Sequence, residues 1–145
     1  MLKSEGAAMT QNEKSLTQSE TPPDEDPVIR TITMPADTNA YGDIFGGWLM
    51  SQMDLAGSNV ASRIARGRAS TVRVEAMNFL RPVRVGDVVS LYGRLVTRGR
   101  TSMKIEVEAW SRARDSEETV KVTEAVFTFV AIDPVTRRPR PLPEE

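Results

Sequence analysis

One stretch of helical periodicity, residues 45–64, most constrains what this chain can fold into. Gly42 and Asp43 precede the stretch, and Asp43 is the expected N-cap because a carboxylate can accept hydrogen bonds from the free amides of a first turn. Gly67 marks the expected end of the helix. Apolar residues recur at steps of three or four: Phe45, Leu49, Met53, Ala56, Val60 and Ile64. The sequence therefore predicts a single long helix whose apolar side needs a sheet to cover it.

Most of the chain after residue 27 is otherwise typical of β-strands. Pro35 and Pro82 end two of the strands, and the apolar positions change faces near Ala76, which predicts a bulge there. The last strand is apolar on both faces, so we expect it inside the sheet. The expected strands are residues 28–34, 71–79, 88–97, 103–109 and 119–132. This order predicts an α+β fold in which an antiparallel sheet of five or six strands wraps around one long central helix.

The two ends of the chain differ from this predicted domain of residues 28–133. Residues 1–27 are polar and acidic with few large apolar side chains, so we expect a disordered tail. Residues 134–145 are rich in arginine and proline and should be irregular. No signal sequence or membrane span is apparent, and the absence of cysteine fits a reducing compartment, so we expect a cytoplasmic protein with no membrane insertion.

Composition narrows the chemistry that the chain can perform. The 145 residues include no histidine and no cysteine. Their absence excludes Ser-His-Asp and Cys-His catalysis and the usual zinc sites, all of which need imidazole or thiolate groups. If the chain is an enzyme, we therefore expect a carboxylate as its base and no metal site.

Asp54 is the carboxylate that the helical pattern singles out. At about 100° per residue it lies roughly 130° from the centre of the apolar stripe, among small residues that let a ligand or another backbone approach. Gly46 and Gly47 leave the amides of the first turn unobstructed, and such amides can stabilise an oxyanion at a reacting carbonyl. The pattern alone leaves open whether Asp54 is catalytic or a solvated residue on the polar side of the helix.

Two features predict binding partners. The sheet cannot cover both sides of one helix, so we expect a second copy, related by two-fold symmetry, to cover the side that carries Asp54.

Residues 63–114 hold twelve basic and four acidic residues, a local charge of +8 in a chain whose net charge is −1. Because the arginines are dispersed through strand-like sequence without interleaved aromatics, a phosphorylated small molecule is preferred to nucleic acid, with solvated strand faces as the ordinary alternative.

Four separate blocks of the sequence agree in order and spacing with those of a known protein family: MPADTNAYGDIFGGWLMSQMDLAG, TVRVEAMNFLRPVRVGDVV, GRTSMKIEVEAW and VTEAVFTFVAID. Together they resemble the hotdog-fold acyl-CoA thioesterases of the bacterial YciA type, over residues 30–133. The resemblance implies hydrolysis of acyl-CoA thioesters to CoA and a carboxylic acid, with no further cofactor because CoA is part of the substrate. It also implies a dimer whose sheets join edge to edge, and the assembly of such dimers into a hexamer, a trimer of dimers.

The resemblance also implies roles for individual residues. Asp54 matches the catalytic carboxylate of the family, acting as general base or nucleophile. Asn39 matches its companion, which is typically supplied by the opposite subunit. Gly46, with Gly47 beside it, matches the amide that polarises the thioester carbonyl. Many relatives have histidine before this glycine pair, whereas this chain has Phe45, as the YciA type itself does.

The predicted hairpin after residue 97 resembles the part of related enzymes that meets the CoA nucleotide: Arg98, Arg100, Thr101 and Ser102. Arg81 and Arg140 are further candidates for the phosphates. Hotdog dehydratases need a catalytic histidine, so the alternative to hydrolysis is a non-catalytic acyl-CoA-binding or regulatory hotdog protein. Fold alone does not separate these two functions, and the set Asn39, Gly46 and Asp54 favours hydrolysis.

Overall fold

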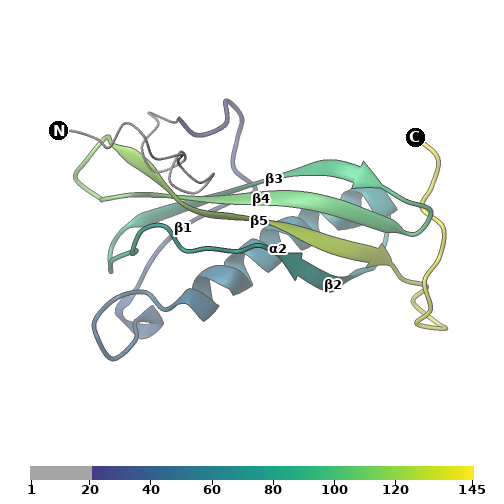
Figure 1. Cartoon of the computed structure of the whole chain (residues 1–145), viewed down its shortest axis with the longest axis horizontal. Coiled ribbons are helices and arrows are strands. Elements are labelled where there is room, and N and C mark those ends of the chain that lie inside the picture. Colours follow the sequence, from purple (N-terminus) through teal and green to yellow (C-terminus); the bar gives the residue numbers. More distant parts are fainter. Residues whose placement is uncertain (1–20) are drawn as a thin grey trace, which may run out of the picture.

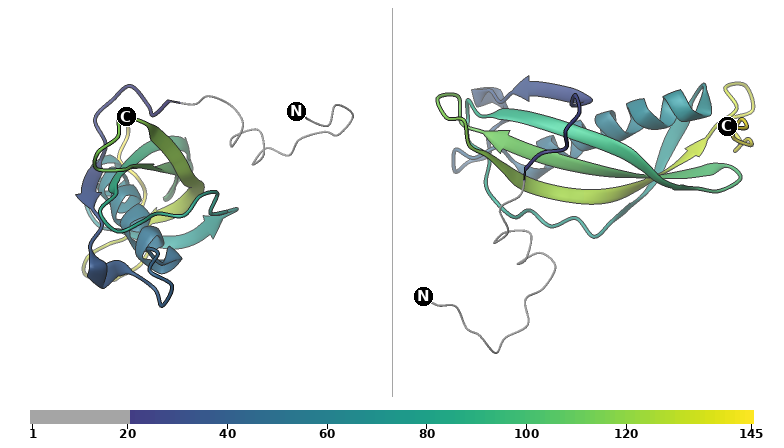
Figure 2. Two further views of the ribbon diagram at one scale, coloured as in Figure 1. Left: turned by 90° about the vertical axis from the view of Figure 1, so that its left-hand side faces the viewer. Right: turned by 90° about the horizontal axis from the view of Figure 1, so that it is seen from above.

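The computed structural model describes residues 21–145 and shows one curled antiparallel sheet with a single long helix lying along it (Figure 1). The five strands are arranged in the order β1-β3-β4-β5-β2. Seen end-on, the sheet curves around the helix (Figure 2). The elements are β1 Ile29–Ile32, a 3-10 helix η1 Pro35–Asp37, α2 Gly46–Ala65, β2 Ala69–Glu75, β3 Val88–Arg98, β4 Ser102–Arg112 and β5 Thr119–Ala131. The predicted α+β architecture is confirmed, with five strands in the part of the chain described.

The apolar side of α2 packs on the concave face of the sheet. The buried residues of the helix are Leu49, Met53, Ala56, Gly57, Ala61 and Ala65. The strands meet them with buried side chains that include Val89, Leu91, Met103, Ile105, Val107, Phe127 and Phe129. The predicted stripe is confirmed in its middle but wrong at its start, because Phe45 precedes the helix and is 42% exposed.

Gly57 allows the helix to approach β5 closely. A Cβ atom at this position would lie 3.0 Å from Cε1 of Phe129 and 3.3 Å from Cγ2 of Val107. Separations this short require a neighbour to shift, so only glycine fits here without disturbance. The Gly57 contact therefore fixes how near the middle of α2 lies to the sheet.

The helix begins later than predicted, and the expectation that Asp43 is its N-cap is wrong. The first helical residue is Gly46, and the N-cap is Phe45, whose side chain makes no capping hydrogen bond. Asp43 forms an isolated antiparallel β-bridge with Arg84. The backbone of Asp43 is therefore part of a β-bridge three residues before the helix begins, and Asp43 does not act as the N-cap. The other end of α2 lies within two residues of Gly67, as predicted.

β2 lies at one edge of the sheet and differs from the predicted strand of residues 71–79. It starts two residues earlier and ends at Glu75, because Ala76 adopts a φ of 52°, in the left-handed region. The register with β5 shifts between Thr71 and Arg73 rather than at Ala76, so the bulge falls at Val72. β5 lies between β4 and β2, which confirms the prediction that the last strand is internal.

The chain after β5 follows an irregular path along the end of the sheet. The backbone amides of Arg140 and Leu142 donate to the carbonyls of Ala131 (2.9 Å) and Arg100 (2.8 Å). The Arg140 guanidinium donates to the carbonyl of Ala65 (2.8 Å) at the end of α2, which satisfies one of the carbonyls that a helix leaves unpaired. This tail thus joins the end of the helix to the β3–β4 hairpin.

A tight turn starts the tail. The Asp133 carboxylate accepts hydrogen bonds from the backbone amides of Thr136 and Val135, each 2.8 Å long. These bonds, chiefly the one from Thr136, hold the pKa of Asp133 below its usual value because they stabilise the charged carboxylate.

The predicted disordered tail of residues 1–27 falls mostly on residues 1–20, which lie outside the described residues. None of the helices in residues 21–145 combines the length and the apolar character needed to cross a membrane.

Candidate active site

The first turn of α2 presents two glycine amides at the end of the sheet. Amides of the first helical turn have no acceptor within the helix, so those of Gly46 and Gly47 need a partner from outside. The ring of Phe79 covers Gly46, since a Cβ atom there would lie 3.2 Å from Cζ of the ring. A Cβ atom on Gly47 would meet Phe45 at 3.4 Å, which is ordinary contact. The missing side chain at Gly46 therefore makes room for an aromatic wall next to a free amide.

A cavity of about 320 Å³ opens beside these amides. Asn39 and Gly46 both line it, together with Asp43 and Arg81. The remaining lining residues are mostly apolar: Ile44, Leu49, Phe79, Pro82, Val83 and Val122. A mostly apolar hollow with a few polar groups at one place is typical of a small-molecule site.

Asn39 is fixed by the turn that leads to the helix. Its Oδ1 accepts hydrogen bonds from the backbone amides of Tyr41 (2.8 Å) and Asp43 (3.1 Å). Gly42 closes this turn with a φ of 86°, a conformation that favours glycine. With its oxygen used by the backbone, Asn39 can offer its Nδ2 hydrogens as donors. The motif Asn-Ala-Tyr-Gly thus positions an amide donor at the cavity.

Asp54 lies in the middle of α2, apart from the other two predicted residues. It stands eight residues after Gly46, which corresponds to about 12 Å along a helix axis. Its carboxylate is half-buried and accepts a 2.5 Å hydrogen bond from Oγ1 of Thr71 in β2. The structure of one chain therefore joins Asn39 with Gly46 but does not join either with Asp54.

The predicted nucleotide-binding residues lie at the β3–β4 hairpin, at the end of the molecule where α2 finishes (Figure 1). The hairpin closes as predicted, with the Gly99 amide donating to the carbonyl of Ser102 (2.8 Å). The carbonyl of Thr101 accepts from the amide of Ala131 (2.9 Å). The hairpin places all four residues together: Arg98, Arg100, Thr101 and Ser102.

The four predicted arginines differ in how the fold uses them. The Arg98 guanidinium donates to the carbonyl of Pro143 (2.5 Å) and lies 3.8 Å from a Glu145 carboxylate oxygen. Arg100 is exposed. Arg81 donates to the carbonyl of Lys121 (2.8 Å), and Arg140 holds the end of α2 as described above.

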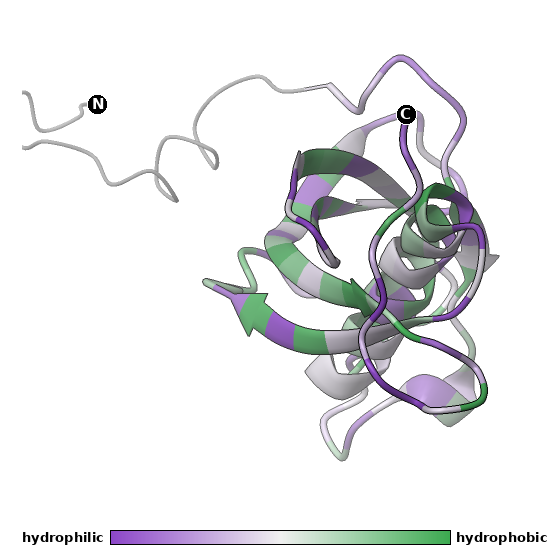
Figure 3. Cartoon of the chain, turned by 90° about the vertical axis from the view of Figure 1, so that its right-hand side faces the viewer, coloured by the Kyte–Doolittle hydropathy of each residue, from purple (hydrophilic) through white to green (hydrophobic). Residues whose placement is uncertain are grey.

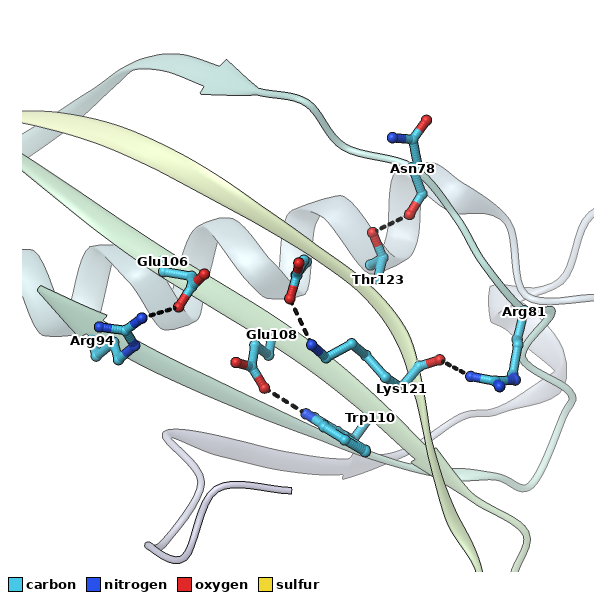
Figure 4. A network of polar contacts seen from close by, with 9 residues as sticks. Asn78, Arg81, Arg94, Glu106, Glu108, Trp110, Lys121 and Thr123 are labelled. Atoms are coloured by element: carbon cyan, nitrogen blue, oxygen red, sulfur yellow. Dashed lines mark hydrogen bonds and ion pairs between the residues drawn. The ribbon is translucent and has the colours of Figure 1, made fainter. Parts of the chain in front are cut away.

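A network of polar side chains lies on the face of the sheet turned away from α2 (Figure 4). Lys121 is buried, bonds to Glu124 (2.6 Å) and has its ammonium 5.6 Å from the centre of the Trp110 ring. Trp110 in turn donates to Glu108 (2.9 Å), and an ion pair joins Arg94 with Glu106 (2.7 Å). Because these pairs lie within or between neighbouring strands, they stabilise the sheet outside the cavity of Asn39 and Gly46.

Sequence reasoning missed Thr71 and Phe79. A threonine within a strand carries no signal of contact with a helix carboxylate, and a phenylalanine near a strand end is ordinarily part of the core. Among residues 21–145 there is also no group of three or more acidic side chains placed to hold a metal ion.

Comparison with known proteins decides the family. A profile described as "Thioesterase superfamily" matches residues 41–117. The chain is 56% identical to the "Acyl-CoA thioester hydrolase YciA" of Salmonella typhimurium over 131 residues, which are 88% of this chain and 98% of that protein. The chain belongs to the thioesterase superfamily, among its YciA-type acyl-CoA thioester hydrolases.

Solved structures of thioesterases have the same fold. A hexameric thioesterase from Yersinia pestis is 53% identical, with a TM-score of 0.79 over 85% of this chain and 99% of that one. A hexameric hotdog-fold thioesterase from Campylobacter jejuni is 35% identical, with a TM-score of 0.77 over 82% of this chain and 91% of that one. The predicted hotdog fold and thioesterase class are confirmed.

Proposed function

We propose that this thioesterase hydrolyses acyl-CoA at a site shared by two protomers, with Asn39 and Gly46 from one and Asp54 from the other. Hydrolysis of acyl-CoA thioesters is the activity for which its curated relatives are named. One observation supports the shared site: Asn39 and Gly46 line one cavity, while Asp54 lies about 12 Å further along the same helix. A separation of about 12 Å is much longer than the hydrogen bonds with which two groups would act on a single thioester.

A two-fold axis beside α2 would bring Gly46 of one protomer close to Asp54 of the other. If two helices lie antiparallel, Gly46 of each chain faces Asp54 of the other when the axis passes near Met50, the midpoint between them. Met50 is exposed in one chain, as are Leu55 of α2 and Val72 and Val74 of the neighbouring edge strand β2. Figure 3 shows the hydrophobic segments of β2, the strand that projects from the sheet on the left.

The free edge of β2 would form the other part of the proposed dimer interface. An edge strand presents unpaired N–H and C=O groups, and its exposed valines would be covered by a second copy. Pairing of two β2 strands would extend the sheet across both chains, and three such dimers would form a hexamer. Hexameric relatives from Yersinia pestis and Campylobacter jejuni support this assembly.

The chemistry follows from the three groups. A water molecule gives a proton to the Asp54 carboxylate while its oxygen attacks the thioester carbon. The carbonyl oxygen becomes an oxyanion held by the Gly46 amide, with Gly47 as its neighbour, and Asn39 orients the water or the carbonyl through Nδ2. The carbon–sulfur bond then breaks, Asp54 returns the proton to the departing sulfur, and a carboxylic acid and CoA remain. In the alternative route the Asp54 carboxylate attacks the carbon itself, and the carbon–sulfur bond breaks to release CoA as a thiolate. Water then hydrolyses the resulting anhydride, which frees the carboxylic acid and Asp54 and supplies the proton that the thiolate takes up.

CoA phosphates need cations, which the hairpin supplies. Arg100 is exposed there, and the hydroxyls of Thr101 and Ser102 are further donors. Arg98 is the weaker partner because the tail already engages its guanidinium. The site thus needs no metal and no cofactor beyond the CoA of the substrate.

The test is thiol release from short, medium and long acyl-CoAs by wild type and by Asp54→Asn. The protein contains no cysteine, so it adds no background to a thiol-reactive dye. We expect kcat to fall by at least ~100-fold in Asp54→Asn, because the amide cannot accept the proton. Asp115→Asn removes the same charge from an exposed loop and serves as the control, with near-normal turnover expected.

Two results would contradict the proposal. Near-normal turnover in a correctly assembled Asp54→Asn protein would remove Asp54 from the mechanism. Tight binding without thiol release in wild type would indicate an acyl-CoA-binding protein instead of a hydrolase.

A further inference from the structure

The tail that follows β5 ends against an arginine of the proposed nucleotide site. The Arg98 guanidinium donates through Nη2 to the carbonyl of Pro143 over 2.5 Å, and its Nη1 lies 3.8 Å from Oε2 of Glu145. The Arg98 side chain is 23% exposed, whereas Arg100 on the same hairpin extends into solvent. Figure 1 shows the end of the tail beside this hairpin. The fold therefore engages Arg98 with the tail and leaves Arg100 accessible.

The tail is anchored just before it reaches Arg98. The backbone amide of Leu142 donates to the carbonyl of Arg100 (2.8 Å), and the Leu142 side chain packs against the hydrophobic core. These contacts bring the chain to the hairpin and limit where residues 143–145 can lie. Because the anchor is adjacent in sequence, the contact of residues 143–145 with Arg98 closes only a short loop and costs little further chain entropy.

The end of the tail carries two exposed carboxylates, those of Glu144 and Glu145. CoA is strongly anionic because it carries a pyrophosphate and a further phosphate. Two carboxylates beside the hairpin therefore oppose the approach of these phosphates to Arg98 and Arg100. An exposed ion pair is weak, since solvent screens it, so the substrate can displace the tail. The tail thus lowers affinity without closing the site.

We propose that residues 143–145 determine how strongly the enzyme binds the nucleotide of its substrate, because they withhold the Arg98 guanidinium and place two negative charges beside the hairpin. This inference rests on the proposed binding of CoA phosphates at the hairpin. The two effects act on the phosphates alone. The tail therefore weakens the binding of CoA thioesters but not of thioesters of pantetheine, which has no phosphate.

The first experiment measures KM in two variants. Removal of residues 143–145 frees Arg98 and takes away both carboxylates, whereas Glu144→Gln with Glu145→Gln removes the charges but keeps the Pro143 carbonyl. For one acyl-CoA we expect KM to fall about 3- to 10-fold in the shortened protein and about 2- to 5-fold in the double variant, with kcat within about twofold. KM for the pantetheine thioester of the same acyl group should stay within about twofold.

The matched control is Glu117→Gln with Glu118→Gln. These two glutamates are exposed in the β4–β5 loop at the opposite end of the sheet, so their replacement makes the same change in net charge away from the hairpin. KM should not change in this control. An equal fall in KM in the control would show a general effect of charge on an anionic substrate and overturn the inference.

The second experiment introduces Arg98→Gln into the full chain and into the shortened protein. Because the tail withholds the guanidinium, the loss of Arg98 should raise KM about threefold more in the shortened protein than in the full chain. An equal rise in both would show that the tail does not act through Arg98. An unchanged KM in both tail variants, or an equal shift with the pantetheine thioester, would also overturn the inference.

The outcomes also separate this inference from the proposed function. If Arg100→Glu raises KM while the tail variants do not lower it, the hairpin binds CoA and the role of the tail fails. If neither Arg100→Glu nor the tail variants change KM, the nucleotide site fails with it. Calorimetric titration with free CoA makes the same comparison without turnover, so the role of the tail is tested even if hydrolysis fails. Thermal melting at one protein concentration checks fold and assembly, and the double variant serves if the shortened protein does not fold.

Discussion

Arg100 offers a test of substrate binding that is separate from the rate of the hydrolysis step. It is exposed on the hairpin, and its backbone carbonyl holds the amide of Leu142 while its side chain extends into solvent. Because the CoA phosphates are remote from the bond that breaks, Arg100→Glu should raise KM by roughly 10-fold and change kcat by less than about twofold. Steady-state kinetics with one acyl-CoA would measure both quantities.

The matched control for Arg100 is Arg114→Glu. This arginine is exposed in the β4–β5 loop, at the opposite end of the sheet, and the substitution changes the net charge equally. An unchanged KM in Arg100→Glu would remove the residue from the proposed nucleotide site. An equal rise in both variants would instead indicate a general effect of charge on the approach of an anionic substrate.

At the residue scale, the resemblance to the thioesterase family named Asn39 and Gly46 together, and the structure places both at one cavity. Their catalytic roles stay predictions. Thr71 was not predictable, since its contact with Asp54 depends on how closely α2 approaches the sheet at Gly57. That distance is a property of packing, which no local sequence pattern reports.

At the scale of elements, the close approach of α2 to β5 at Gly57 can be tested by substitution. Gly57→Ala would place a methyl group 3.0 Å from the Phe129 ring, so the helix or the ring must move. Overpacking of this kind costs about 1–3 kcal/mol, and we expect a lower melting temperature at a fixed protein concentration. Turnover should fall as well, because the shift moves Asp54 relative to Thr71.

The control on the same helix is Ser51→Ala. Ser51 is exposed and its hydroxyl bonds only to the carbonyl of Trp48 in its own helix (2.7 Å). Its replacement should change the stability by less than about 0.5 kcal/mol. If Gly57→Ala melts at the wild-type temperature, the contact with Phe129 does not set the position of the helix.

Elements with a strong internal pattern were predicted well, and those defined by their neighbours were not. Apolar and polar residues alternate along β4, and the hairpin that joins it to β3 was predicted. β5 is buried or half-buried along its whole length, as expected for a strand that is apolar on both faces. The start of α2 and the end of β2 were wrong because tertiary contacts decide both. Asp43 is drawn into a bridge with Arg84, and Ala76 takes a left-handed backbone as the chain leaves the sheet.

At the scale of the whole molecule, one chain shows an incomplete surface. Its edge strand β2 is free, and apolar side chains remain exposed along β2 and the adjacent side of α2. The need for a second copy was predictable from one helix and one sheet, because a single sheet covers only one side of a helix. To predict which residues would meet across the two-fold axis, the positions of Gly46 and Asp54 along α2 had to be known.

Complementation between two inactive variants tests the shared site directly. Asn39→Asp keeps an oxygen for the amides of Tyr41 and Asp43 but removes the Nδ2 donor, and Asp54→Asn removes the carboxylate, so each variant alone should be inactive. Unfolding and refolding an equal mixture forms hybrid dimers in about half of the cases, and each hybrid has one site with both groups intact. Thiol release should therefore recover to about a quarter of the wild-type activity per protomer.

The pattern of recovery distinguishes the two possible architectures. If Asn39 and Asp54 served one site within a single chain, every protomer in the mixture would carry one defect, and no activity would return. A parallel mixture of wild type with Asp54→Asn measures the yield of refolding, because its activity should settle near half of the wild-type value under either architecture and with or without chain exchange. Native mass spectrometry of variants that differ in mass would count the hybrids directly. Full exchange without recovery would place Asn39 and Asp54 in one chain's site and would contradict the shared site.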